Sequence, residues 1–232
     1  MTPETLTLLP LWYVAFLLSL TCHEAGHAFA AYRGGDETAY LGGQVSLNPL
    51  PHIRREMFGT VVVPLLSFVL YSSQGVSWML GWASAPYDPY WEDRHPRRAA
   101  FMAAAGPLAN LALAAVAFAV LKIGLLQGLW LSPEITAIDR LVAPAGPGGE
   151  LVEGAGRFFS ILFSLNLILM AFNLLPVPPL DGASILAGLF PPARRLRDTM
   201  RSSPMAALIG LLIAWKLFPL IFSLFRPLFR LL

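Results

Sequence analysis

A short motif near the start of the chain combines two imidazoles and a carboxylate in an otherwise apolar segment. His23, Glu24 and His27 form the pattern H-E-x-x-H within "TCHEAGHAFA". On a helix, residues 23 and 27 lie one turn apart on the same face, so both imidazoles can bind one metal ion. The carboxylate of Glu24 then lies near the open coordination position of that metal. This is the residue spacing of a zinc hydrolase.

Two imidazoles do not complete such a site, because a catalytic zinc normally takes three protein ligands and leaves a fourth position for water. The candidates for the third ligand are His52, His95 and the few acidic residues associated with apolar segments. Asp181 stands out because it follows a proline-broken helix end, and an ionisable group inside a membrane is a functional candidate by default. The alternative role of Asp181 is to cap a helix that starts at Gly182.

The composition indicates a membrane protein. Of the 232 residues, 56% are hydrophobic and 13% are charged. A helix needs roughly 20 apolar residues to cross a bilayer. The regions that approach this length are residues 8–32, 57–82, 99–124, 156–176 and 204–225. The single cysteine, Cys22, excludes an internal disulfide framework. The net charge is +2, and the basic residues lie in short loops between apolar segments, so the charge gives no indication of nucleic-acid binding.

The segments between these regions refine the predicted fold class. Gly34 and Gly35 are expected to stop the first helix. The spacing of apolar residues in 38–56 then predicts a short β-like re-entrant segment after it. The second apolar region is interrupted by Pro64 and by "SSQG" at 72–75, so it is either one kinked helix or two half-spans. We therefore predict an all-α polytopic membrane protein with about five to six transmembrane helices or half-helices.

The direction of the helices is constrained if His23 and Asp181 bind one ion. Both residues lie toward the far ends of their spans, so these two helices must run in the same direction, with an odd number of crossings between them. Two apolar regions intervene. We therefore expect residues 57–82 to enter and leave on one side, or to pair two half-spans, and residues 99–124 to make the single return crossing.

The distribution of basic residues predicts the orientation in the membrane. The connection 125–155 carries Arg140 and four acidic residues before residue 155. By the positive-inside rule, the loops rich in arginine face the cytoplasm, which places the metal toward the cytoplasmic leaflet. These arginines are Arg33, Arg54, Arg55, Arg94, Arg97, Arg98, Arg194, Arg195, Arg197 and Arg201.

Several motifs together resemble a known family. H-E-x-x-H, "GPLAN" at 106–110 and "NLLPVPPLDG" at 173–182 are similar to motifs of the site-2 protease family of intramembrane zinc metalloproteases. "LNPLPHI" at 47–53 and "GWASAPYD" at 81–88 resemble its small bacterial branch, which lacks PDZ and CBS domains. The resemblance covers most of residues 17–185.

The resemblance implies a function and a set of site residues. It implies one Zn²⁺ ion held by His23, His27 and Asp181, with Glu24 activating a zinc-bound water and Asn173 near the substrate carbonyl. Residues 1–232 would form a single transmembrane protease domain that hydrolyses peptide bonds within or near transmembrane segments of membrane-protein substrates. The expected location is a bacterial cell (inner) membrane, as a multi-pass protein with its active site toward the cytoplasm, in contact with lipid and the substrate.

Two other functions remain open. Intramembrane histidine and aspartate also mark ion pathways, so a membrane metal-ion transporter or metal-binding protein is one alternative. An inactive protease relative that binds helices as a scaffold is the other. A transporter has no specific need for Glu24 directly after a metal ligand.

Three further polar residues have more than one interpretation. Asn166 lies seven residues before Asn173, on roughly the same helical face, and could line a water path or serve helix packing. His52 is either a further metal ligand or a loop histidine bonded to backbone carbonyls. His95, in "WEDRHPRR", is expected to be solvated.

Overall fold

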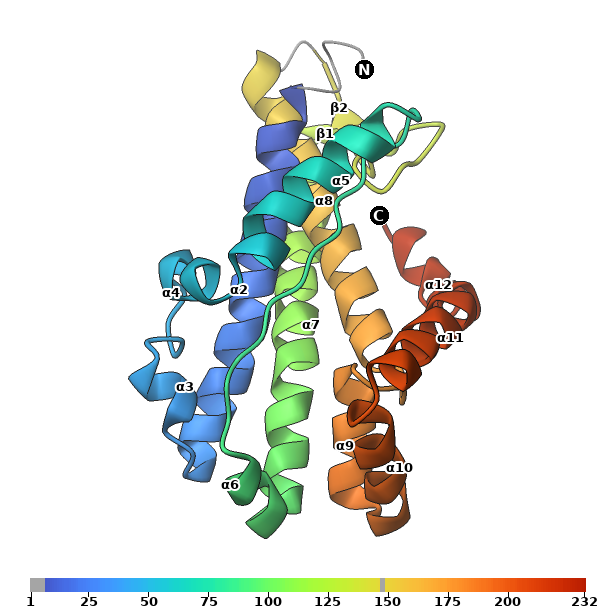
Figure 1. Ribbon diagram of the computed structural model, residues 1–232. Coiled ribbons are helices and arrows are strands. Elements are labelled where there is room, and N and C mark those ends of the chain that lie inside the picture. The colour runs from blue at the N-terminus through green and yellow to red at the C-terminus, as the bar shows by residue number, and fades with distance from the viewer. Residues whose placement is uncertain (1–6, 147–148) are drawn as a thin grey trace.

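The computed structural model describes residues 7–146 and 149–232. Within these ranges the chain is mostly helical, and its strands form one two-stranded sheet. Three long helices, α2, α7 and α8, form the centre of the molecule, and the shorter elements lie around them (Figure 1). The predicted mostly helical fold is confirmed.

Helix α2 covers Leu9–Gly34 and carries the H-E-x-x-H motif. Pro10 stands at its start, where the missing N–H of a proline costs no hydrogen bond. Gly35 ends the helix with φ 95°, a left-handed conformation that glycine adopts without strain. Its N–H bonds back to the carbonyls of Ala31 and Tyr32. The predicted stop at the paired glycines is confirmed.

Helices α7 (Pro96–Leu126) and α8 (Gly149–Asn173) complete the central group. Figure 1 shows α2 and α8 running in the same direction and α7 running back between them. The connection from α7 to α8 contains strands β1 (Trp130–Leu131) and β2 (Ala143–Pro144), which pair antiparallel. This is the helix order that convergence of His23 and Asp181 requires.

The three central helices pack closely. Large side chains such as Leu121 of α7 and Ile161 of α8 belong to one core cluster with residues of α2 and are 0% exposed. Small residues such as Ala114 and Ala117 are also buried to 1% or less, which lets the helix backbones approach one another. Close approach of α7 to α2 matters for the site, because it brings α7 against the imidazole-bearing face.

The segment after α2 differs from the prediction. The expected β-like re-entrant segment is wrong: α3 (Thr38–Leu41) is a single helical turn, α4 (Pro49–Arg55) is a short helix, and turns and bends join them. Local turn chemistry outweighs the apolar alternation here. Gly43 takes φ 72°, and Asn48 caps α4 by accepting a hydrogen bond from the Leu50 N–H at 3.0 Å.

The second apolar region runs away from the C-terminal end of α2 and then returns toward that end (Figure 1). A π-helical turn, η1 (Phe58–Val62), continues into α5 (Val63–Ser72). Residues 76–88 then come back without regular secondary structure, toward α6 (Pro89–Arg94) (Figure 1). The Trp82 N–H donates to the Gly59 carbonyl at 3.0 Å, which holds the two halves together. The return is an extended chain, so the pairing of two half-spans is not observed.

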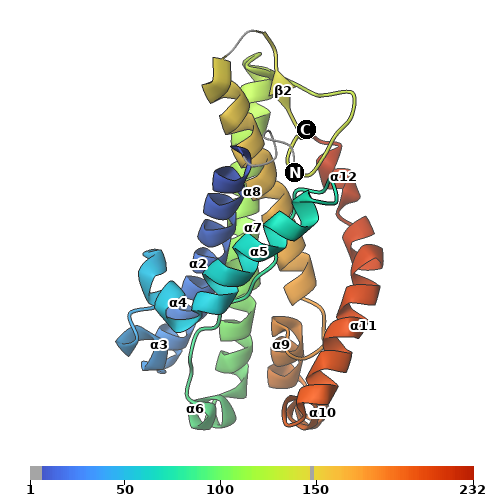
Figure 2. The same ribbon diagram turned by 45° about the horizontal axis from the view of Figure 1, so that its top comes forward.

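Four helices follow α8. They are α9 (Asp181–Leu189), α10 (Pro191–Arg201), α11 (Pro204–Ser223) and α12 (Arg226–Phe229). Both ribbon views place α9 and α10 beside the end of α8, with α11 running along the outside of the molecule (Figures 1 and 2). The proline-rich stretch between α8 and α9 therefore turns the chain and places the first residue of α9.

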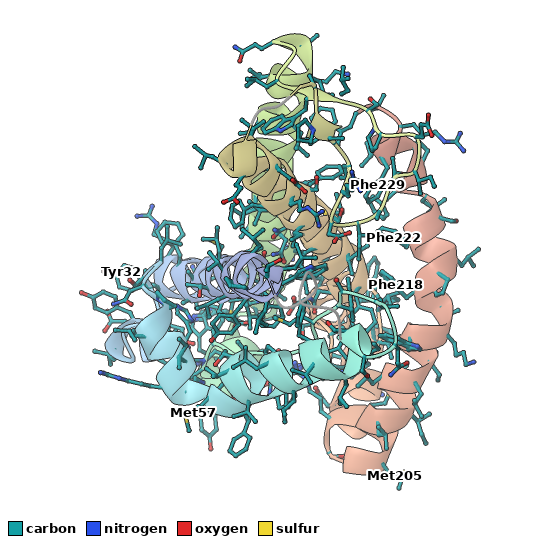
Figure 3. The ribbon with its side chains drawn as sticks, turned by 90° about the horizontal axis from the view of Figure 1, so that it is seen from above. Tyr32, Met57, Met205, Phe218, Phe222 and Phe229 are labelled. Atoms are coloured by element: carbon teal, nitrogen blue, oxygen red, sulfur yellow. The ribbon has the colours of Figure 1, made fainter. Side chains whose placement is uncertain are left out.

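Aromatic contacts attach the last helices to the core. Phe218 of α11 lies with its ring centroid 5.6 Å from that of Phe172 in α8, and Phe229 of α12 lies 5.3 Å from Phe163. Figure 3 shows Phe218, Phe222 and Phe229 on the side that faces the centre of the molecule. These rings make α11 part of the same bundle.

Among the described residues, α7 and α8 are long and apolar enough to cross a membrane. Shorter apolar helical stretches cover Phe58–Ser72 and Leu208–Leu220. The 26-residue helix α2 has sufficient length, but its imidazoles and carboxylate lower its hydropathy. The number of crossings stays a prediction.

Candidate metal centre

Helix α2 holds the two imidazoles of the H-E-x-x-H motif one turn apart. The Nε2 atoms of His23 and His27 are 3.0 Å apart, and the ring planes are at 85° to each other. His23 is 5% exposed and His27 is 8% exposed. Both imidazoles therefore point one ring nitrogen at the same buried spot.

Asp181, the first residue of α9, reaches the same spot from a distant part of the chain. Its Oδ2 lies 3.1 Å from His23 Nε2, and its Oδ1 lies 3.3 Å from His27 Nε2. One ligand atom from each of the three residues lies within 4.8 Å of the other two. The residue at the N-cap of α9 is Leu180, so the alternative capping role of Asp181 does not match the structure.

Helix α7 lies directly against the imidazoles at Gly106. A Cβ atom at this position would lie 2.6 Å from His23 Nε2 and would also overlap His27 Nε2. The "GPLAN" motif thus contains a glycine because two rings occupy the space of its side chain. Asn110, one turn further along α7, places its Oδ1 2.6 Å from His23 Nδ1.

The donor set fits a divalent cation. The carbonyl of Met102 lies 2.7 Å from His27 Nδ1 and can only accept, so Nδ1 carries a proton and the Nε2 of the neutral imidazole presents a lone pair. Asp181 Oδ2 is buried and has no hydrogen-bond partner in the described part of the chain. Lone pairs gathered without a donor are unfavourable unless a cation satisfies them. Histidine nitrogen and aspartate oxygen are ligands that zinc prefers.

A cavity of about 490 Å³ opens beside these residues. Glu24, which is 4% exposed, lines it together with the three candidate ligands. Residues 81–85 of the returning chain form part of its wall. The cavity is large enough to hold water beside Glu24 and the three candidate ligands.

One end of this cavity is polar. Arg201 donates from Nη1 to the Tyr87 hydroxyl oxygen at 2.8 Å and from Nη2 to Ser184 Oγ at 3.0 Å. Burial raises the pKa of the Tyr87 phenol above its ordinary value, so this group stays neutral at physiological pH. Glu92 also lines this end.

Asn173, the last residue of α8, lines the same cavity. Its Nδ2 donates to the Leu169 carbonyl at 3.1 Å, which leaves a second N–H on the same nitrogen. Asn166 lies elsewhere: it is fully buried and bonds to Asn110 and Ser19 on neighbouring helices. Of its two interpretations, helix packing is the one that the structure matches.

The remaining histidines lie outside the cavity lining. His52 is 1% exposed, and its Nε2 lies 3.1 Å from the Ser46 carbonyl, which matches the expected bond to backbone, but the residue lies in helix α4 and not in a loop. His95 stands at the N-cap of α7, with its ring 6.3 Å from that of Trp91. Cys22 is half-buried and lines a separate apolar hollow with Phe29.

Sequence reasoning gave no role to three residues near the centre. Gly106 and Asn110 belong to the "GPLAN" motif, which assigns neither of them a partner, and Ser19 belongs to no motif. In each case the sequence signal is a polar residue or a glycine within an apolar helix. Such a residue is unfavourable there unless a specific contact requires it. Their partners lie on other helices and could not be assigned before the helices were placed.

The fold and the site define a helical protein with a candidate two-histidine, one-carboxylate metal centre among apolar helices. The chain belongs to peptidase family M50, whose family model matches residues 11–217. The resemblance to site-2 proteases is thereby confirmed, as is membership of a zinc metalloprotease family. Membership and the apolar helices together support a membrane location.

Two curated relatives illustrate this membership. "Putative zinc metalloprotease YwhC" of Bacillus subtilis is 33% identical over 199 residues, which cover 85% of this chain and 77% of the relative. "Putative zinc metalloprotease Rip2" of Mycolicibacterium smegmatis is 30% identical over 190 residues, which cover 78% of this chain and 60% of the relative. No solved structure matches the chain significantly.

Proposed function

We propose that this protein is an intramembrane zinc metalloprotease that hydrolyses peptide bonds within or near transmembrane segments of membrane-protein substrates. The observation that carries the proposal is the convergence of His23, His27 and Asp181 in one group, with a ligand atom of each within 4.8 Å of the others, beside a cavity that Glu24 also lines. In this proposal His23, His27 and Asp181 hold one Zn²⁺ ion, and Glu24 and Asn173 are the catalytic residues.

The ion, when bound, supplies a Lewis acid and lowers the pKa of a coordinated water. Glu24 accepts a proton from the attacking water and delivers it to the leaving amide nitrogen. The water oxygen first adds to the carbonyl carbon, which moves negative charge onto the carbonyl oxygen. The C–N bond then breaks as the nitrogen receives the proton from Glu24, which yields a carboxylate and an amine. Asn173 donates its free N–H to the oxygen on which negative charge develops.

The surroundings of the site support cleavage in a membrane. Exposed apolar side chains on α7 include Phe101, which is 74% exposed, and Leu108, which is 60% exposed, as suits contact with lipid. We propose that the metal centre lies toward the cytoplasm in a bacterial cell membrane, an orientation that the arginine-rich loops favour by the positive-inside rule. The proposed partners are lipid and a transmembrane protein substrate. The single domain over residues 1–232 is part of this proposal.

The test is proteolysis by the reconstituted protein. The full chain is placed in liposomes with zinc and a single-span substrate, and it is compared with Glu24→Gln. The matched control is Glu37→Gln, because Glu37 is exposed and lies outside the cavity lining. We expect cleavage by the wild type and by the control, and none by Glu24→Gln, with about one zinc ion bound per chain in all three.

Two results would contradict this proposal. Zinc flux across the liposome membrane without proteolysis would support a transporter. Zinc binding with neither flux nor cleavage of any single-span substrate would support a helix-binding scaffold.

A further inference from the structure

Three polar side chains cross the apolar interior behind His23. Ser19 comes from α2, Asn110 from α7 and Asn166 from α8, and each is 0% exposed. Buried amides and hydroxyls among apolar helices are costly unless their hydrogen bonds are satisfied. Here they bond to one another in a row that ends at the imidazole, and the direction of every bond in that row can be determined.

The row begins at Ser19. Its Oγ lies 2.6 Å from the Ala15 carbonyl, which can only accept, so the hydroxyl proton is used in that bond. Asn166 Nδ2 lies 2.8 Å from Ser19 Oγ and therefore donates to it. The second N–H of the same nitrogen is directed at the Leu162 carbonyl, 2.7 Å away. The nitrogen and oxygen of the Asn166 amide are thereby distinguished.

The next bond follows from this assignment. Asn166 Oδ1 can only accept, and it takes a hydrogen bond from Asn110 Nδ2 at 2.7 Å. Asn110 Nδ2 also lies 3.3 Å from the Ser19 carbonyl. Since both contacts require the nitrogen of the Asn110 amide, its Oδ1 is the atom that faces His23 Nδ1 at 2.6 Å. His23 Nδ1 must then carry the proton, and Nε2 presents its lone pair to the candidate metal centre.

The two imidazoles differ in how they are held. His27 Nδ1 bonds to the backbone carbonyl of Met102, whereas His23 Nδ1 bonds to a side chain. We propose that Asn110 is a positioning residue that sets the tautomer and ring plane of His23 for zinc binding, with Asn166 and Ser19 fixing the Asn110 amide. This inference rests on the proposed zinc site and extends it to residues that do not touch the ion.

The experiment measures zinc affinity directly, with no substrate present. The full chain in detergent competes for zinc with a chromophoric chelator, and its unfolding temperature is measured without zinc. Asn110→Leu keeps a similar volume and removes the acceptor, and we expect it to weaken zinc binding about 10- to 100-fold. Asn110→Asp keeps an acceptor toward Nδ1 but loses the N–H groups that bond to Asn166 Oδ1 and the Ser19 carbonyl, so it is expected to recover only part of this loss. Ser164→Ala, which removes another buried hydroxyl from α8, is the control with unchanged affinity.

A purely structural Asn110 gives a different pattern. Asn110→Leu would then lower the unfolding temperature of the zinc-free protein but bind zinc as the wild type does, and this result overturns the inference. If Asn110→Leu does not fold, Ser19→Ala tests the inference in its place. Several-fold weaker zinc binding by Ser19→Ala supports the inference, and unchanged zinc affinity overturns it. Failure of the proposed function is separate, because the wild type would then bind no zinc, or His23→Ala would bind it unchanged.

Discussion

Gly106 of α7 and His27 of α2 are in contact with no room for a side chain between them. A Cβ atom at position 106 would overlap His27 Nε2 and would lie 2.6 Å from His23 Nε2. Gly106→Ala must therefore displace the imidazoles or separate α7 from α2. We expect a marked loss of zinc affinity, measured by chelator competition, and destabilisation of about 1–3 kcal/mol, as is usual for overpacking.

The matched control for this change is Gly154→Ala in α8. An added Cβ there meets nothing within 4 Å, and alanine favours a helix over glycine by about 1 kcal/mol. The control should bind zinc as the wild type does and unfold at the same or a higher temperature. Unchanged zinc affinity in Gly106→Ala would show that the imidazoles do not need the close approach of α7.

A second prediction concerns Asp181. Asp181→Asn keeps the size of the side chain but replaces a carboxylate by an amide, which is a poor zinc ligand because zinc binds Asp through its charged oxygen. Metal analysis of the purified protein should give about one zinc ion per chain for the wild type and much less for the variant. Asp139→Asn, in the connection between α7 and α8, is the control and should retain zinc. Full zinc content in Asp181→Asn would exclude Asp181 as the third ligand.

Removal of the metal should lower stability. A ligand that binds only the folded state stabilises it by about 4 kcal/mol when present at about 1,000 times its dissociation constant. Zinc should thus raise the unfolding temperature of the chelator-treated protein, measured in detergent by intrinsic tryptophan fluorescence. His27→Ala should show little of this shift. An equal shift in wild type and variant would indicate that zinc acts at another place.

The pairing of His23 and His27 in the H-E-x-x-H motif could be predicted from sequence because its geometry is local. The spacing of His23 and His27 places both rings on one face of any helix, whatever the rest of the fold does. The position of Asp181 relative to the motif is harder to predict, because it depends on how many times the chain crosses the molecule between them. The requirement that α2 and α8 run in the same direction, drawn from the chemistry, is met by the structure.

Other features could not be predicted because they depend on contacts between distant elements or on competing local signals. The apolar alternation after α2 suggested extended chain, but Gly43 and the Asn48 cap favour turns and a short helix. The row from Ser19 to His23 requires three helices at once, and no spacing in the sequence reveals which polar residues will meet.

The last prediction concerns two ion pairs that join α6 to α10. Glu92 and Arg197 form a pair whose side chains are 10% and 6% exposed, whereas Asp93, in the neighbouring pair with Arg194, is 64% exposed. Removing one partner of a buried pair leaves an uncompensated charge and typically costs about 3–5 kcal/mol, whereas an exposed pair contributes about 0–1 kcal/mol. The two pairs connect the same helices and differ in burial, and Arg197 also has Asp198 as a closer second partner than Arg194 does.

Glu92→Gln should lower the free energy of unfolding more than Asp93→Asn, because it removes the more buried of the two carboxylates. Arg197 keeps a second carboxylate partner, Asp198, whose Oδ1 lies 2.7 Å from its Nη2, so the loss should fall short of that for a fully unpaired buried charge. Denaturant unfolding in detergent measures the difference. Equal and small effects would mean that water reaches the Glu92 pair. Glu92 also lines the polar end of the cavity, so Glu92→Gln should loosen α6 from α10 and open that end to solvent. Faster hydrogen exchange of the α10 amides would detect this opening.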